Sequence, residues 1–293
     1  MKITLLGSLG NINQHTIPRL VTDGHEVTVV TSSSERVAAI EALGAKAAVG
    51  QMEDVDFLTK TFTGQDLVYL MIAMSGTPNE KAVEERAAIY SQAIKDSGVK
   101  QVVNLSSVGA QTPEAGILYQ YHHMEDALDA VETSTVSHIR PVGFYTNLFA
   151  QLETIKSQGK IFDAISPETK RAWVATEDIA DAVYARIKAL LSDEEVSKSQ
   201  YVLSDFASGQ EWLAALAENG VQADYVKISV DQQIQGMLKA GLPKEIAEGF
   251  GQMSRIQEQP DRLYEEITAG NYHQGKVKIT DFAKIFAAAV KAN

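Results

Sequence analysis

Residues 3–15 read ITLLGSLGNINQH, and this stretch predicts a strand, a glycine turn and a helix in that order. Residues 3–6 form an apolar run long enough for a buried strand, and residues 7–10 form a tight turn. A helix is expected from Asn11 to the Asp23-Gly24 pair. In this setting the amide groups at the helix N-terminus bind the pyrophosphate of a dinucleotide.

The glycine spacing of the turn is incomplete. The narrow pattern Gly-x-Gly-x-x-Gly fails because other residues stand at positions 9 and 12. The wider pattern Gly-x-x-Gly-x-x-Gly fits at two of three places, with Asn13 in the third, where glycine eases packing between helix and strand. An ordinary turn between strand and helix remains the alternative. The expected cofactor contacts are Gly7, Leu9, Gly10, Asn11 and Ile12.

The composition excludes several classes of protein. The 293 residues include no cysteine, so disulfides, a thiol nucleophile and cysteine-based metal sites are ruled out. A net charge of −12 argues against a nucleic-acid surface. No apolar run approaches the ~20 residues that span a membrane, and the apolar part of MKITLLGS is too short for a signal peptide. We therefore expect a cytoplasmic protein with neither nucleic acid nor membrane as partner.

Strands and helices alternate along the first half of the chain. Strands are expected at residues 26–31, 45–49, 66–73, 101–105 and 136–140, with helices between them. Strict alternation predicts an α/β fold with a Rossmann-type, doubly wound parallel sheet. Ligands of such sheets bind at the carboxyl ends of the strands, so the residues after each strand are the informative ones.

The tip of the second strand favours NADP over NAD. Its sequence, SSSER at residues 32–36, lacks the acidic residue that binds the ribose 2′-hydroxyl of NAD. Ser32, Ser33 and Arg36 are candidate contacts, and Arg36 suits a 2′-phosphate. The alternative is a helix cap at Ser34 with Arg36 in solvent. Gln51, Ala73 and Met74 follow the next two strands and are expected beside the adenine and pyrophosphate, unless they are plain connectors.

Five segments together resemble one family. They are the glycine turn, the Gly50-Gln51 pair, NLSSVGA at 104–110, HIRPVGFYTNL at 138–148 and WVATEDIADAV at 173–183. The set is similar to the NmrA-like branch of the atypical short-chain dehydrogenases/reductases. Gln51 and Asn13 depart from that pattern, since members commonly have aspartate and glycine there.

The resemblance implies a Rossmann domain with a smaller C-terminal α/β domain over the cofactor cleft. We assign residues 1–150 to the cofactor domain, with 172–191 packing back onto it, and 151–293 to the substrate domain. Phe144, Tyr145 and Asn147 are expected to face the substrate, with an ordinary core or loop role as the alternative. Family members include NADP-dependent reductases of quinones and plant phenolics, and catalytically silent dinucleotide sensors.

The catalytic residues of the wider superfamily are only partly present. There, a serine orients the carbonyl, a tyrosine transfers the proton, and a lysine one helical turn later lowers the tyrosine pKa. Ser106, Tyr119 and His123 stand at these places, so histidine replaces lysine. No lysine occurs between Lys100 and Lys156, and a phenol of ordinary pKa ~10 is a poor base without such help.

Two functions remain open at this stage. One is an NADPH-dependent reductase of a small carbonyl or quinone, because a quinone accepts hydride without a dedicated tyrosine acid. The other is a silent dinucleotide sensor that acts through protein partners. The six scattered histidines predict no metal site. The sequence leaves open whether the protein forms a homodimer or binds a protein partner.

Overall fold

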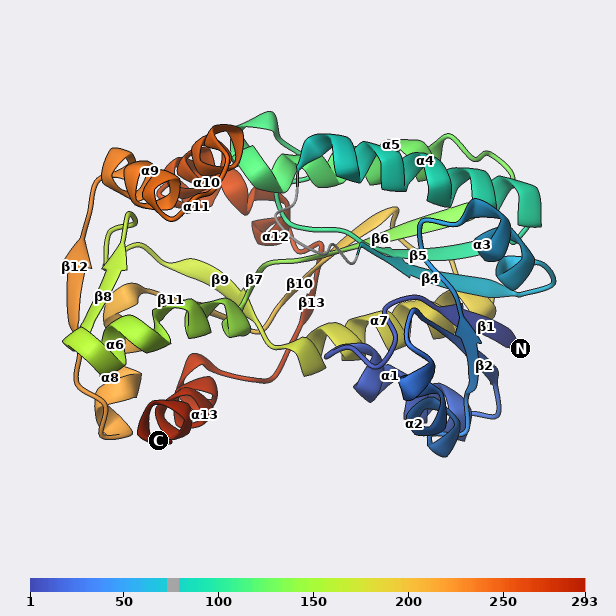
Figure 1. Ribbon diagram of the computed structural model, residues 1–293, viewed down its shortest axis with the longest axis horizontal. Helices are drawn as coiled ribbons and strands as arrows, with labels where there is room; N and C mark the ends of the chain where they lie inside the picture. Colours follow the sequence, from blue (N-terminus) through green and yellow to red (C-terminus); the bar gives the residue numbers. More distant parts are fainter. Residues whose placement is uncertain (73–78, 293) are drawn as a thin grey trace. The chain divides into compact units, whose positions relative to one another are not determined.

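A computed structural model describes residues 1–72 and 79–292 (Figure 1). Ala73 and Met74, two of the expected cofactor contacts, lie outside these residues. The largest sheet has eight strands in the order β13-β10-β6-β5-β4-β1-β2-β3. The strand pairs with a described register in this sheet are all parallel. The expected doubly wound parallel sheet is therefore confirmed.

The strands of this sheet are β1 (Lys2–Leu5), β2 (Glu26–Thr31), β3 (Lys46–Val49), β4 (Leu67–Met71), β5 (Gln101–Leu105), β6 (Thr135–Pro141), β10 (Ser199–Leu203) and β13 (Tyr272–Gln274). Two smaller sheets contain β7 (Gly143–Phe144), β8 (Lys160–Asp163), β9 (Arg171–Val174), β11 (Asp205–Ala207) and β12 (Asp224–Lys227).

The helices associated with the main sheet are α1 (Asn13–Thr22), η1 (Ser34–Arg36), α2 (Val37–Ala42), α3 (Val55–Phe62), α4 (Glu80–Ser97), α5 (His122–Asp129) and α7 (Thr176–Leu191). The remaining helices are η2 (Pro113–Tyr121), η3 (Tyr145–Gln151), α6 (Leu152–Gln158), α8 (Gly209–Glu218), α9 (Val230–Lys239), α10 (Lys244–Gln257), α11 (Pro260–Leu263), α12 (Glu265–Thr268) and α13 (Ile279–Lys291).

The internal contacts of the chain divide it into two compact units. Unit 1 comprises Met1–Ser107, Gln120–Arg140 and Ile179–Gln200, and unit 2 comprises Val108–Tyr119, Pro141–Asp178 and Tyr201–Asn293. Both units are discontinuous in sequence. The boundary expected at residue 150 stays a prediction.

Unit 1 is a layered structure. The helices α3, α4 and α5 cover one face of its sheet, and α1, α2 and α7 cover the other (Figure 1). Apolar residues of the inner strands, such as Val68 and Leu70 of β4, are fully buried against Tyr90 and Ile94 of α4. On the opposite face, Arg19 of α1 pairs with Asp181 of α7 at 2.5 Å. Helix α7 thus packs beside α1 on this face of the sheet, although the two helices are more than 150 residues apart in the sequence.

Unit 2 has an aromatic core. Tyr145 stacks on Phe282 with 5.2 Å between ring centroids, and Trp212 meets Phe286 edge-on at 5.1 Å. The Tyr145 side chain is 1% exposed, and its hydroxyl donates to the carbonyl of Val277 at 3.1 Å. Tyr145 is therefore part of this core, and a substrate contact for it stays a prediction. Phe144 is half-buried and Asn147 is exposed, and a substrate role for these two stays a prediction.

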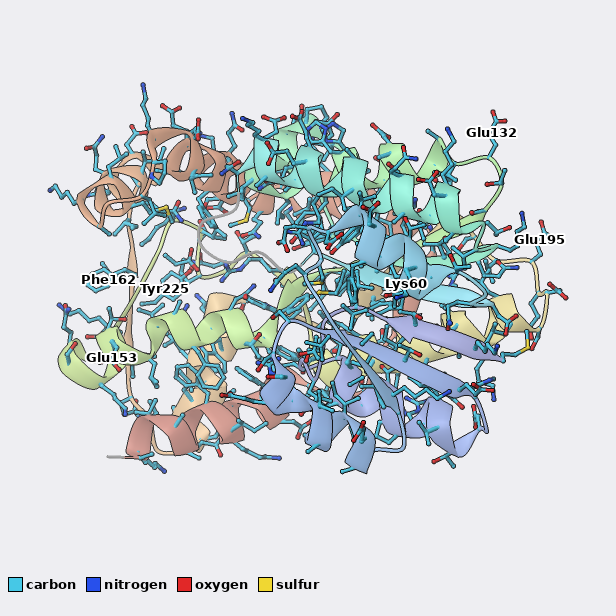
Figure 2. The ribbon with its side chains drawn as sticks, turned by 45° about the vertical axis from the view of Figure 1, so that its right-hand side comes forward. Lys60, Glu132, Glu153, Phe162, Glu195 and Tyr225 are labelled. Atoms are coloured by element: carbon cyan, nitrogen blue, oxygen red, sulfur yellow. The ribbon has the colours of Figure 1, made fainter. Side chains whose placement is uncertain are left out.

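The two-stranded sheet of unit 2 leaves an aromatic ring at the surface. Strands β8 and β12 are parallel, and Phe162 of β8 pairs in register with Val226 of β12. The Phe162 side chain is 41% exposed (Figure 2). The neighbouring Tyr225 instead donates its hydroxyl hydrogen to the carbonyl of Ile165 at 2.9 Å.

Two glycines bring the backbone of η2 against helix α10 in unit 2. Gly116 has φ 60° and ψ −123°, a conformation that kinks η2 and that L-residues avoid. A Cβ there would collide with the carbonyl oxygen of Gly249 and with Gln252. A Cβ on Gly249 would in turn press on Ile117 at 3.3 Å.

We expect Gly116→Ala to lower the free energy of unfolding by about 2–5 kcal/mol, because backbone strain and overpacking add. Gly241→Ala is the matched control, since Gly241 also has positive φ (+89°) but nothing within 4 Å of its Cβ position. It should show the strain alone, about 1–3 kcal/mol. Equilibrium urea denaturation of both variants measures the difference. Equal losses would show that the contact with α10 contributes nothing.

Candidate functional site

The glycine turn of unit 1 spans residues 6–12, since α1 begins at Asn13 rather than Asn11. Gly7 has φ +97° and Ser8 has φ +51°, and the amide of Gly10 donates to the carbonyl of Gly7 at 3.1 Å. A Cβ on Gly7 would lie 3.1 Å from the side chain of Met71 in β4. The first glycine is therefore required both for its backbone angle and for the close approach of β4.

Asn13 fills the place of the third glycine with a structural role of its own. Its side chain is buried, and its Nδ2 donates to the carbonyl of Leu6 at 2.8 Å and to that of Ser8 at 2.9 Å. These two bonds hold both ends of the Gly7 kink against the start of α1. The departure from the glycine pattern is therefore compensated by a side-chain clamp, which sequence reasoning missed.

The N-terminus of α1 has no side-chain cap. Its N-cap residue is Ile12, whose side chain cannot accept a hydrogen bond, and the first turn contains no acidic residue. Asn11 is exposed and Leu9 is half-buried in the same turn. The amides of Gln14 and His15 in this turn donate to the carbonyls of Gly10 and Ile12. The partial positive charge of a helix N-terminus nevertheless favours an anion such as a pyrophosphate at this end of α1.

Hydrogen bonds join the turn to the tip of β2. The Ser8 hydroxyl donates to Oγ1 of Thr31 at 3.1 Å, and this same Oγ1 accepts the amide of Ser33 at 3.3 Å. Ser33 then caps η1 by accepting the amide of Glu35 at 3.3 Å, so the expected serine cap exists one residue earlier than Ser34.

Arg36 and Ser32 are exposed at this tip. In the part of the chain that the structure describes, Arg36 forms no ion pair, so its guanidinium is available to an external anion.

Gln51 follows β3 beside the same tip. The amide of Gly50 donates to the carbonyl of Thr31 at 3.0 Å, which places residues 50–51 next to the end of β2. A Cβ on Gly50 would lie 2.5 Å from the ring of Phe57, so glycine is needed there for packing. Gln51 itself is exposed, and its amide side chain can donate and accept.

A buried ion pair lies at the carboxyl end of β5. Glu125 of α5 accepts from Nε and Nη2 of Arg140 in β6 at 3.0 and 2.6 Å. Burial raises the pKa of Glu125, but Arg140, the nearby His138 and Ser106 outweigh it, and the pKa lies below its ordinary value. The Ser106 Oγ is buried close to this carboxylate, yet has no hydrogen bond of good geometry in the described chain.

A second buried network runs beside this pair. His138 of β6 is 1% exposed; its Nδ1 lies 3.1 Å from Asn104 Nδ2 and its Nε2 lies 3.1 Å from Asp129 Oδ1. Lys198 pairs with the other Asp129 oxygen at 2.6 Å. Asp129 belongs to the segment 126–132, which reads in sequence as a solvated helix face. Asp129 instead pairs with His138 of β6, and no sequence pattern indicates this contact.

Tyr119 and His123 do not share one α-helix. Tyr119 belongs to the kinked η2, and His123 lies in the first turn of α5. The 3-10 helix η2 passes directly into α5 between them. The Nε2 of His123 lies 3.0 Å from Oε1 of Glu80 in α4. Catalytic roles for Ser106, Tyr119 and His123 stay predictions.

Comparison with known proteins gives consistent results. Residues 7–189 match a family described as NAD(P)H-binding. An NAD(P)H azoreductase from Xenophilus azovorans is 25% identical over 295 residues, which cover 99% of each chain. Among the residues that the structure describes, no helix has the length and apolar character to cross a membrane.

Two solved structures share the fold over nearly the whole chain. Triphenylmethane reductase from Citrobacter sp. superposes with a TM-score of 0.76 at 16% identity, covering 98% of this chain and 100% of that one. NADPH-dependent quinone oxidoreductase QOR2 from Escherichia coli, complexed with NADPH, gives 0.76 at 17% identity, covering 97% and 99%.

We expect Asn13→Ala to lower the free energy of unfolding by about 2–4 kcal/mol, because two buried carbonyl groups lose their donor. Affinity for NADPH should fall about tenfold or more as the turn loosens. Asn271→Ala is the control, since Asn271 is not among the expected cofactor contacts and its side chain forms no hydrogen bond in the described chain. Urea denaturation and calorimetric titration with NADPH measure both quantities. An Asn13→Ala variant that matches Asn271→Ala in both would refute the clamp.

Proposed function

Because the chain belongs to the NAD(P)H-binding family, we propose that it is an NADPH-dependent reductase of a small quinone, azo or carbonyl compound. The observation that carries this proposal is the N-terminus of α1, which has no side-chain cap, behind the clamped glycine turn. At the neighbouring strand tip lies Arg36, which forms no ion pair within residues 1–72 and 79–292. A cytoplasmic location belongs to the same proposal and agrees with a chain that has no cysteine.

The residues of unit 1 fit the cofactor group by group. The backbone of the glycine turn, at the positive end of the α1 dipole, would hold the pyrophosphate. Gly10 is required by the turn itself, because a Cβ there would lie 3.0 Å from the Gly7 carbonyl oxygen. Arg36, with Ser32 and Ser33, would hold the 2′-phosphate through charge-assisted hydrogen bonds. Gln51 would line the adenine side. These assignments favour NADPH over NADH.

The bound cofactor would supply a hydride, so the acceptor gains two electrons and needs one proton or none, depending on its own pKa. Ser106, at the carboxyl end of β5, would orient the oxygen or nitrogen of the acceptor. The Glu125–Arg140 pair would hold that strand end in place. Because no lysine supports Tyr119, we propose acceptors whose reduced anion is stable enough to take its proton from water.

The relatives support a reductase over a silent sensor. The azoreductase, triphenylmethane reductase and quinone oxidoreductase are each named for reduction of a conjugated small molecule. Nothing about this chain's own geometry favours the sensor. Phe144 and Asn147 remain the proposed substrate contacts, and a homodimer remains untested.

We expect Arg36→Glu to weaken NADPH binding by ~1.5–3 kcal/mol, about 10- to 150-fold, because a charge-assisted contact is replaced by repulsion. NADH affinity should change little, since NADH has no 2′-phosphate. Lys60→Glu makes the same change in net charge on α3 (Figure 2) and should leave the NADPH preference intact. Calorimetry with both cofactors decides the matter. Equal wild-type affinity for NADPH and NADH would refute the assignment.

Quinone and azo-dye reduction should respond little to Tyr119→Phe, whereas a true general acid would contribute ~10²–10⁴-fold to the rate. Oxidation of simple secondary alcohols should be very slow in the wild type, because that reaction needs a phenolate. His123→Lys should strengthen alcohol oxidation if position 123 does replace the superfamily lysine. NADPH oxidation and NADP reduction across both substrate panels test this.

Brisk alcohol oxidation by the wild type that collapses in Tyr119→Phe would overturn the proposed mechanism. Tight NADPH binding without turnover of any acceptor would instead favour the sensor.

A further inference from the structure

Three side chains with metal-ligating groups meet where α4 and α5 begin. Glu80 and Glu84 are four residues apart and share one face of α4, and His123 lies in the first turn of α5. The two helices run side by side in unit 1 (Figure 1). Neither the cofactor turn nor the strand tips contribute to this cluster.

The donor atoms are spaced as metal ligands are. The Nε2 of His123 lies 3.0 Å from Oε1 of Glu80 and 3.6 Å from Oε1 of Glu84. One donor atom from each of the three residues lies within 4.8 Å of the other two. Ligands at 2.0–2.1 Å around a tetrahedral ion are about 3.3 Å apart, so small side-chain adjustments suffice to coordinate one ion.

The charges around the cluster favour a cation. The Glu80 and Glu84 side chains are 69% and 54% exposed, and neither pairs with a lysine or arginine within residues 1–72 and 79–292. The nearest lysine in sequence, Lys81, pairs with Glu85 instead, at 3.7 Å. His123 is only 21% exposed, so its ring is held in place beside the two carboxylates. With a neutral imidazole, two negative charges share one small volume.

We propose that Glu80, Glu84 and His123 bind one divalent transition-metal ion, with water in the remaining coordination positions. The imidazole nitrogen selects Zn²⁺, Co²⁺ or Ni²⁺ over Mg²⁺ and Ca²⁺, which take oxygen ligands. A bound ion ties the first turn of α4 to the first turn of α5. The proposal is tested by metal binding alone, which requires neither substrate nor NADPH.

The test titrates Zn²⁺ into the full-length, metal-free protein by calorimetry. We expect one ion per chain, with no displacement by excess Mg²⁺. Co²⁺ should give a visible absorption spectrum of nitrogen and oxygen coordination. The thermal unfolding midpoint should rise with Zn²⁺ concentration, since an ion that binds only the folded chain stabilises it.

Variants separate this site from nonspecific binding. His123→Ala should lose about 100-fold or more in Zn²⁺ affinity, and Glu84→Gln at least about tenfold, because loss of a direct ligand exceeds the effect of an outer-shell partner. Glu84 is exposed, so its variant should fold normally even if His123→Ala does not. The matched controls His15→Ala and Glu85→Gln remove the same chemical groups elsewhere on the surface and should bind Zn²⁺ as the wild type does.

Absence of Zn²⁺ binding to the wild type would overturn the proposal. So would wild-type affinity in both His123→Ala and Glu84→Gln, or loss of binding in His15→Ala.

Discussion

Two hydrogen bonds from the buried Asn13 amide hold the turn on which the rest of unit 1 depends. They fix the carbonyl groups of Leu6 and Ser8 on either side of Gly7, so the turn keeps its shape without the third glycine. From Ser8 the hydrogen bonding continues through Thr31 to Ser33, which caps the short helix that carries Arg36. One side chain thus connects the uncapped end of α1 to the tip of β2. In Rossmann folds these are the places that bind the pyrophosphate and the ribose 2′ group of a dinucleotide.

The charged groups of unit 1 divide by burial. At the end of β5 the carboxylate of Glu125 is paired with Arg140 through two hydrogen bonds. This pairing is needed because an unpaired buried charge would strongly destabilise the fold. His138 is likewise enclosed between an amide and a carboxylate. His123 lies instead beside two glutamates, and its imidazole, unlike a lysine ammonium group, carries no permanent positive charge.

The sequence predicts the elements whose information is local. The strands predicted at residues 26–31 and 101–105 have the predicted bounds, because short runs rich in apolar residues indicate buried strands directly. Strand β13 and the Asn13 clamp were not predicted. Strand β13 depends on pairing with the distant β10, and the clamp depends on the geometry of one side chain. The kink of η2 at Gly116 was not predicted either, because it depends on contact with α10, between residues more than 130 positions apart. The cluster of Glu80, Glu84 and His123 was not predicted either, because its members are far apart in the sequence.

The aromatic core of unit 2 has a consequence for synthesis of the chain. Tyr145 is covered by Phe282 of α13, and its hydroxyl bonds a carbonyl 132 residues further along. At 5–20 residues per second, a ribosome needs on the order of ten seconds to make that interval. During this time the nascent chain lacks α13, so the rings that this helix covers stay without it: Tyr145, Trp173 and Trp212. Unit 2 therefore completes its core only after translation has passed α13, and a chaperone has its best opportunity to bind before then.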